Sequence, residues 1–188
     1  KWNLARFAEC LIPLIDKDQD EAIKIATETI NNFEKIYEVK WLNMMRDKLG
    51  LFGEDKNDKI LIEDLLNWME KNKADYTNTF CNLMNIKTSN NEIYNNKDYI
   101  NWTNKWQKRI LLNNSSKDKS LKLMKSSNPV VIPRNHKVEE ALKEANENNL
   151  EVMNKLLSIL TKSYENQKNI EDFQSPSNTK EYQTFCGT

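Results

Sequence analysis

The stretch NPVVIPRNHKVEEAL, residues 128–142, departs most clearly from the Lys- and Asn-rich helical sequence around it. Pro129 and Pro133 each lack a backbone donor and fix φ, so residues 128–133 cannot form a regular helix. The residue before each proline is restricted to extended conformations. From Val138 onward, apolar residues recur at helical spacing. The stretch therefore predicts a rigid, non-helical connector that leads directly into an amphipathic helix.

The rest of the chain has the composition of an all-α protein. Among its 188 residues are only three glycines and four prolines, and 30% of the residues are charged. Few helix breakers and many Lys, Glu and Leu residues favour helices. The length allows one domain with its own core, or one large piece of a bigger domain. Because the chain opens with Lys1 rather than Met, we expect it to be cut from something longer.

Charge, hydropathy and cysteine spacing narrow the class of protein. The formal net charge is zero, so the broad basic surface of a nucleic-acid-binding protein is absent from the sequence. No apolar run is long enough for a membrane-spanning helix, and no secretory signal opens the chain. We therefore expect neither a nucleic-acid nor a membrane partner. Cys10, Cys81 and Cys186 lie far apart, which is typical of a reducing cytoplasm.

Apolar residues at spacings of three and four predict helices along most of the first 162 residues. We expect them at residues 2–15, 20–49, 58–86 with a break at 72–77, 99–112, 117–125, from 138 onward and around 153–160. The continuous apolar stripe of residues 20–49 predicts a central core helix, with Gly50 at its C-cap. Residues 87–96 read as a loop. Residues 163–188 read as a polar, extended tail.

Sequence motifs for phosphate or metal binding are absent. Glycines only at 50, 53 and 187 cannot build the usual phosphate-binding loop, and His136 is the single histidine. A functional trio of Arg134, Asn135 and His136 is one reading of the connector. We favour a structural one, in which Asn135 and His136 cap the helix start and Arg134 holds a carboxylate bidentately. Glu139 and Glu140 then fall in the first helical turn, where carboxylates meet the helix dipole favourably.

Three other groups of residues invite a functional reading. Trp102, Trp106 and Arg109 form a WxxxWxxR pattern that could stack on a ligand, but we expect the rings to pack in the core with an edge contact. Asp75 alone is a weak metal ligand, because a cation site needs several oxygens. The thiol of Cys186, third from the end, is either inert or a candidate for redox exchange, and the sequence leaves both readings open.

Six ordered blocks together resemble the C-terminal part of the selenoprotein O family, protein adenylyltransferases with a kinase-like (pseudokinase) fold. The blocks are WNLAR at 2–6, MRDKLGL at 45–51, ADYT at 74–77 with Phe80, the Trp102, Trp106 and Arg109 pattern, NPVVIPRNHKVE at 128–139 and YQTFCGT at 182–188. The fifth is the most recognisable, and its family positions are Asn128, Pro129, Pro133, Arg134, Asn135, His136 and Glu139. Cys81 departs from the pattern, since arginine is usual there.

The resemblance implies a parent enzyme that binds ATP with Mg²⁺ and transfers AMP to Ser, Thr or Tyr hydroxyls of proteins. Its catalytic, phosphate-binding and metal-binding residues would lie upstream of the WNL segment. We therefore assign no catalytic, cofactor-binding or metal residue to this chain, and we expect the 188 residues alone not to transfer AMP.

The resemblance also implies an organisation and partners. Residues 1–162 would form the helical part of a kinase-like C-lobe with a family-specific extension, supporting the missing N-terminal region. Residues 163–188 would carry Cys186, the counterpart of the selenocysteine of eukaryotic members, with Cys10, Cys81 or an upstream thiol as its partner. Protein substrates of the parent and a bacterial cytoplasmic location complete this reading. The alternative is a non-catalytic helical module for protein interactions.

Overall fold

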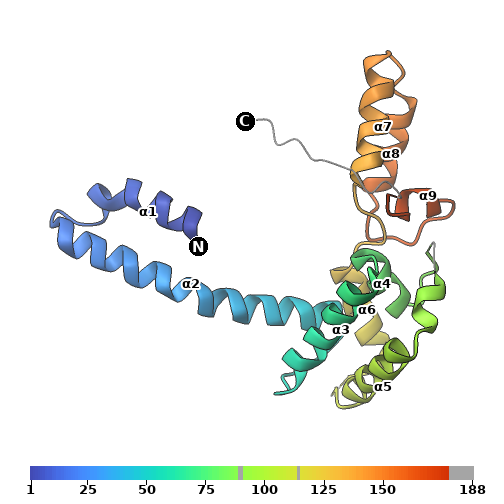
Figure 1. Cartoon of the computed structure of the whole chain (residues 1–188), viewed down its shortest axis with the longest axis horizontal. Coiled ribbons are helices and arrows are strands. Elements are labelled where there is room, and N and C mark those ends of the chain that lie inside the picture. Colours follow the sequence, from blue (N-terminus) through green and yellow to red (C-terminus); the bar gives the residue numbers. More distant parts are fainter. Residues whose placement is uncertain (89–90, 114, 178–188) are drawn as a thin grey trace. The chain divides into compact units, whose positions relative to one another are not determined.

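The computed structural model describes residues 1–88, 91–113 and 115–177, and within these ranges the chain forms helices and turns with no strand (Figure 1). The all-α prediction is therefore confirmed. The chain divides into two compact units, residues 1–44 and residues 45–188, and each is described separately below. None of the helices in the described part of the chain is long and apolar enough to cross a membrane.

The first unit is a helical hairpin. Helix α1 (Trp2–Ile15) and the greater part of α2 (Gln19–Lys48) run back along each other (Figure 1). Lys1 Nζ and Glu34 form an ion pair at 3.0 Å, which joins the start of α1 to the middle of α2. Between the helices, the side chain of Asp18 accepts hydrogen bonds from the first amides of α2 and so caps it.

The prediction that residues 20–49 form a central core helix is wrong for the described part of this unit. Ala22 and Ala26 are buried, but Ile23 is 46% exposed and Tyr37 is 56% exposed. Within the hairpin, α1 runs along this stretch of α2 but leaves Ile23 and Tyr37 exposed (Figure 1). A periodic apolar stripe shows which face of a helix requires burial, but it does not show what covers that face.

The second unit contains the remaining helices. In chain order these are α3 (Asp58–Asn72), α4 (Tyr76–Leu83), the 3₁₀ helix η1 (Asn91–Asn95), α5 (Lys97–Leu111), α6 (Lys117–Ser127), α7 (Asn135–Asn146), α8 (Glu151–Leu160) and α9 (Glu171–Gln174). Helix α3 packs on α5, and α7 packs on α8. The core holds apolar side chains such as Leu65, Phe80 and Val131. The loop predicted over residues 87–96 includes the short η1, which periodicity over so few residues could not reveal.

Capping residues fix where these helices begin and end. The side chains of Asp75, Asn96 and Ser116 accept backbone N–H groups at the starts of α4, α5 and α6. Lys73 ends α3 in the left-handed conformation at φ 53°, which produces the predicted break between α3 and α4.

Gly50 ends α2 as the sequence predicts. Its φ is +67°, and the amide of Leu51 donates to the carbonyl of Arg46 at 2.9 Å, closing the last turn. A Cβ at residue 50 would lie 2.8 Å from the Ser120 carbonyl oxygen and 2.9 Å from Met124 Cγ. The close approach of α6 therefore requires glycine here for space as well as for conformation.

The tail predicted to be extended from residue 163 is helical at residues 171–174. Phe173 of α9 is buried, and so is Ile170 immediately before it. The polar composition concealed these two apolar anchors, because two large side chains in a short segment produce no periodic signal. Residues 178–188, with Cys186, lie outside the described residues.

Candidate functional site

The connector at residues 128–134 is held by buried hydrogen bonds on both sides. Asn128 is 1% exposed, and its Nδ2 donates to the carbonyl oxygens of Lys48 and Met124, each at 2.8 Å. These bonds tie the end of α2 to the end of α6. Val130 is also buried, and its amide donates to the Ser163 carbonyl at 2.6 Å. Because the prolines prevent helical pairing here, the backbone takes partners from distant segments instead.

Gln174 of α9 closes the connector from the other side. Its side-chain Nε2 donates to the backbone carbonyl of Val130 at 2.9 Å. The backbone carbonyl of Gln174 accepts a hydrogen bond from Asn78 Nδ2 at 3.1 Å. Both side chains are buried. These hydrogen bonds join three parts of the chain in one polar joint: helix α4, the connector and the segment after α8. The side-chain amides of Asn78 and Gln174 are both needed there, because buried polar groups require partners.

Arg134 fastens this joint to α4. Its two terminal nitrogens donate to the two carboxylate oxygens of Asp75 at 2.7 and 2.9 Å, so the predicted bidentate carboxylate partner is confirmed. Asp75 Oδ1 also accepts the amide of Asn78 at 2.8 Å as the N-cap of α4. One carboxylate therefore caps a helix and neutralises an arginine.

The remaining predictions for this block need correction. Arg134 occupies the N-cap of α7, and no side chain caps that helix start, so the capping role expected of Asn135 and His136 is wrong. Helix α7 begins at Asn135, directly after Arg134 in the extended cap conformation at φ −71° and ψ 131°. Glu139 and Glu140 consequently lie beyond the first turn, away from the positive end of the helix dipole.

A second, larger charge cluster surrounds Asp58 at the start of α3. Asp58 is 1% exposed, and its two carboxylate oxygens accept from Arg46 Nε and Arg109 Nε, each at 2.7 Å. Burial raises the pKa of Asp58, but the hydrogen bonds from Arg109 and Arg46 outweigh this effect, and the pKa is lowered overall. Asp58 is therefore ionised in the folded chain at neutral pH.

Arg109 reaches further into the turn after α2. It also donates to Asn113 Oδ1 at 3.0 Å and to the carbonyl oxygens of Phe52 and Gly53 at 3.3 and 3.2 Å. The guanidinium fork is thus occupied on its several donors, and the geometry is that of a structural clamp.

Trp102 and Trp106 lie in the core as predicted. Their indole N–H groups donate to the carbonyls of Leu61 and Leu49 at 2.8 and 2.9 Å, so both polar edges are satisfied by backbone. The rings are nearly parallel, with 8° between their planes and centroids 6.1 Å apart, instead of meeting by an edge. Both are buried, with 4% of Trp102 and 8% of Trp106 exposed.

Lys48 and Cys81 form a contrasting pair of buried ionisable groups. The Lys48 ammonium lies over the ring of Phe80 at 4.5 Å and that of Tyr76 at 5.3 Å, and burial lowers its pKa. Burial raises the pKa of the Cys81 thiol to about 11. Its Sγ faces the carbonyls of Pro129 and Val130. Cys81 is thus a packing residue, not a reactive thiol.

The positions of the few arginines in the sequence could have predicted where the two charge clusters lie. Of the four arginines, Arg46, Arg109 and Arg134 each hold a carboxylate with little exposure. A coding bias toward lysine leaves arginine where a rigid bidentate donor is required. Asp58 itself was not predicted, because an aspartate at a helix start reads as an ordinary first-turn acid.

In both clusters a carboxylate is paired with arginine, and the Asp58 cluster is the more deeply buried. No group of three or more His, Cys, Asp or Glu side chains in the described ranges has the arrangement of a metal site.

Comparison with known proteins identifies the family of this chain. A family model described as protein adenylyltransferase SelO matches residues 1–161. The chain belongs to the SelO family. It is 57% identical to the protein nucleotidyltransferase YdiU of Pelagibacter ubique (strain HTCC1062), over 100% of this chain and 39% of that protein. The YdiU proteins of Alkaliphilus metalliredigens (strain QYMF) and Clostridium perfringens (strain 13 / Type A) are 46% and 42% identical over the same shares.

The chain thus spans about 39% of the length of these SelO-family relatives. Five residues of the resemblance, Asn128, Arg134, Asp75, Trp106 and Arg109, are buried or make side-chain hydrogen bonds in the second unit, whereas Trp2 and Leu4 of the WNLAR block are exposed. Cys10 is exposed, and the redox role of Cys186 stays a prediction.

Proposed function

We propose that this chain is the helical C-terminal part of a SelO-type protein adenylyltransferase, whose ATP- and Mg²⁺-binding residues lie in the rest of the polypeptide. The observation that carries the proposal is the match of the protein adenylyltransferase SelO model to residues 1–161. Relatives that are named nucleotidyltransferases match along the whole chain and are much longer than it.

The structure supports a scaffolding role for this part. Ion pairs fix the starts of two helices, a buried one at Asp58 for α3 and a partly buried one at Asp75 for α4. Asn128 fixes the connector against α2 and α6. Catalysis of phosphoryl or nucleotidyl transfer depends on holding metal and phosphate ligands in place. A rigid helical base that positions a catalytic region supplies that requirement without contributing a ligand of its own.

The test compares two proteins in one assay. The full-length protein and the 188-residue chain are each incubated with ATP labelled on the α-phosphate, Mg²⁺ and a protein acceptor. We expect label on protein with the full-length enzyme and none with the 188 residues. Incorporation by the 188-residue chain would overturn the division of roles, and no incorporation by the full-length protein would overturn the activity.

A second candidate is a non-catalytic helical interaction module, which the exposed apolar residues of α1 favour. The same assay separates the two functions. If the chain is an interaction module, we expect no nucleotide incorporation by either the 188-residue chain or the full-length protein. We then expect a stable complex between the 188 residues and a separate protein. The adenylyltransferase predicts incorporation that requires the remaining part of its own polypeptide.

Redox chemistry at Cys186 is a further part of the proposed function. The counterpart of this residue near the end of related chains suggests a thiol that pairs with another cysteine of the whole protein. A count of free thiols in the full-length protein, before and after reduction, tests this. Reduction should expose two additional thiols, and an unchanged count would exclude the pairing.

A further inference from the structure

Helix α1 has the composition of a helix from a protein interior. Its sequence WNLARFAECLIPLI contains only three polar residues, Asn3, Arg6 and Glu9. None of its residues is buried, and Phe7 and Leu14 are 61% and 82% exposed. Arg6 and Glu9 pair with each other, so even the polar positions offer little net charge. These three polar residues are spaced by three and share one side of α1, so the remaining sides form a broad apolar face, which other protein segments normally cover.

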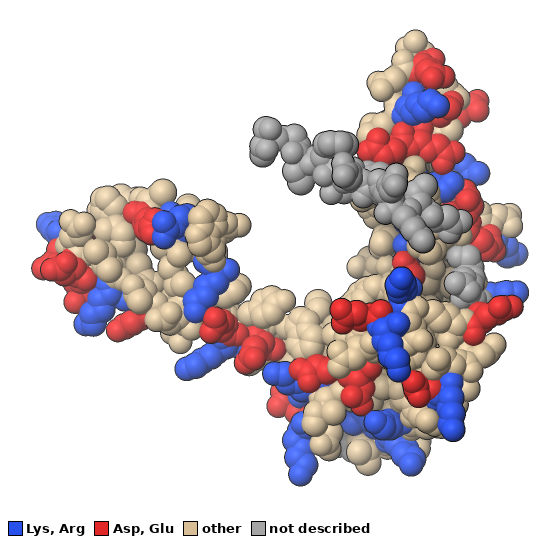
Figure 2. Space-filling view, viewed as in Figure 1, with Lys and Arg blue, Asp and Glu red and all other residues tan. Residues whose placement is uncertain are grey.

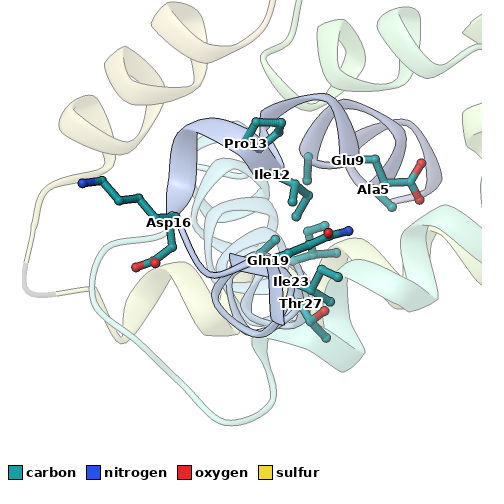
Figure 3. A pocket seen from close by; sticks show the side chains of 12 residues that line it. Ala5, Glu9, Ile12, Pro13, Asp16, Gln19, Ile23 and Thr27 are labelled. Carbon is teal, nitrogen blue, oxygen red and sulfur yellow. The ribbon is translucent and has the colours of Figure 1, made fainter. Parts of the chain in front are cut away.

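The hairpin also contains an open groove. A hollow of about 800 Å³ lies between α1 and α2, and Figure 3 shows Ile12 of α1 and Ile23 of α2 projecting into it. Ala5, Ala8 and Ala26 widen it, because their small side chains leave room between the helices. Phe7 and Leu14 do not line the groove, so α1 has a second exposed apolar face away from it.

Charge distribution separates this region from the rest of the chain. On the face seen in Figure 2, Lys, Arg, Asp and Glu are interspersed over the second unit, whereas α1 is mostly covered by uncharged atoms. A helix that lies on a membrane surface usually carries several Lys and Arg residues on its polar side. The only basic residue in α1, Arg6, is already paired with Glu9. The surface therefore suits an apolar protein segment better than an anionic lipid surface.

We propose that an apolar segment of the same polypeptide, outside these 188 residues, fills the α1–α2 groove and covers the outer face of α1. The inference rests on the proposed function, since it names the surface by which the scaffold meets the catalytic region. Two findings favour this occupant over a second copy. The relatives have about three-fifths of their length outside the matched part, and the family match includes the whole hairpin. Large apolar side chains that are exposed together on one helix, as Trp2, Phe7 and Leu14 are, are typical of an interface.

Thiol accessibility tests both faces of α1 directly. Cys10 is exposed and does not line the groove, while an Ala8→Cys variant places a thiol in it. Each is alkylated under native conditions, and the rate is read by peptide mass spectrometry in the 188-residue chain and in the full-length protein. We expect both thiols to react roughly tenfold or more slowly in the full-length protein, since modification then requires local opening. A Lys122→Cys variant, at an exposed position on α6, should react equally fast in both.

Each contrary result has a definite meaning. Equal rates at Cys10 in the two proteins would overturn the proposal. Protection of Cys10 in the 188-residue chain alone, with dimers seen by sedimentation, would assign the surface to a second copy and overturn it as well. Protection restored only by adding lipid vesicles would assign it to a membrane. Because none of these readings uses nucleotide transfer, a full-length protein that protects Cys10 but transfers no AMP would refute only the proposed function.

A pair of substitutions provides an independent measurement. Leu14→Asp places a charge on the outer face of α1, and Leu112→Asp places one at a similarly exposed leucine after α5. In the 188-residue chain, both should leave the melting temperature nearly unchanged. In the full-length protein, we expect Leu14→Asp to lower it by several degrees more than Leu112→Asp. Equal shifts for the two variants in the full-length protein would contradict a covered α1.

Discussion

The two units of this chain bury their apolar residues to very different degrees. In the second unit, Ile62 and Leu65 of α3 are fully buried, whereas in the first unit Phe7 and Leu14 of α1 are mostly exposed. Both helices carry apolar residues at helical spacing, so the difference lies in what surrounds them. In the second unit, neighbouring helices bury the apolar residues, and buried ion pairs add to the packing. In the hairpin, described over residues 1–44, no further helix covers the apolar residues of α1. Substitutions should therefore be costly in the second unit and mild in the first.

The largest effect is expected at Asp58. Replacing it with alanine removes the buried carboxylate that Arg46 and Arg109 share, and leaves the more distant, exposed Glu54 beside Arg46, which should cost ~3–5 kcal/mol in the free energy of unfolding. Urea denaturation of the 188-residue chain measures this. Asp64→Ala, which removes an exposed partner of Lys105, is the matched control and should cost less than ~1 kcal/mol. Similar costs for the two variants would show that the buried cluster is not a main support of the second unit.

Gly50 should come next. Gly50→Ala combines a positive φ with a clash against the Ser120 carbonyl and Met124, and we expect a cost of ~2–4 kcal/mol. Gly53→Ala is a close control, because its φ is also positive at +70° but no atom lies within 4 Å of the added Cβ. Its cost should be ~1 kcal/mol, from backbone strain alone. Equal losses for the two variants would show that the close packing of α6 against residue 50 does not contribute to the cost of the substitution.

A smaller effect is expected for Arg134→Lys. Lysine keeps the charge but cannot hold both oxygens of Asp75, so the joint should lose ~1–2 kcal/mol. Arg6→Lys at the exposed pair with Glu9 should change stability by less than ~0.5 kcal/mol. Thermal unfolding of both variants gives the comparison, and a neutral Arg134→Lys would mean that bidentate geometry is not required.

Acid should weaken the second unit through Asp58. Because its pKa is lowered in the folded chain, the ionised form contributes stability above the unfolded pKa of about 3.9, and this contribution is lost as pH falls through the lower folded pKa. Urea midpoints measured from neutral pH down to strongly acidic pH should fall more steeply for the parent chain than for Asp58→Ala. Parallel pH profiles would contradict a lowered pKa at this residue.

The smallest effect is expected in the hairpin. Leu14→Ala in the 188-residue chain removes a side chain that is 82% exposed and should change stability by less than ~0.5 kcal/mol. Leu65→Ala, at a fully buried position, should cost ~2–5 kcal/mol. Circular dichroism melts of both variants test whether the two units differ as described. A large loss at Leu14 would show that α1 is already covered in this chain.

The sequence predicts local features of this fold well. The break between α3 and α4, the Gly50 C-cap and the non-helical connector all follow from residues whose backbone preferences act locally. The bidentate role of Arg134 was predicted, but Asp75 as its partner was not, because the two lie 59 residues apart in sequence. The spacing of residues in the sequence does not show which residues this far apart come into contact.

Two errors have one physical cause. The α2 stripe was expected in a central core, and the tail after residue 163 was expected to be extended without buried anchors. In both cases composition describes what a segment prefers, while burial depends on which other segments reach it. Phe173 finds a place near Lys137 and Lys155, whose ammonium groups lie 5.6 and 5.4 Å from its ring. Ile23 finds no comparable cover in the hairpin.

Hydrogen exchange of α1 tests the central claim most directly, namely that this SelO-family chain is a scaffold completed by the rest of its polypeptide. Backbone amides of α1 and α5 are compared in the 188-residue chain and in the full-length protein. The account predicts that α5 is protected in both, and that α1 exchanges rapidly in the 188 residues but slowly in the full-length protein. Equal protection of α1 and α5 in the 188-residue chain, or rapid exchange of α1 in the full-length protein, would contradict it.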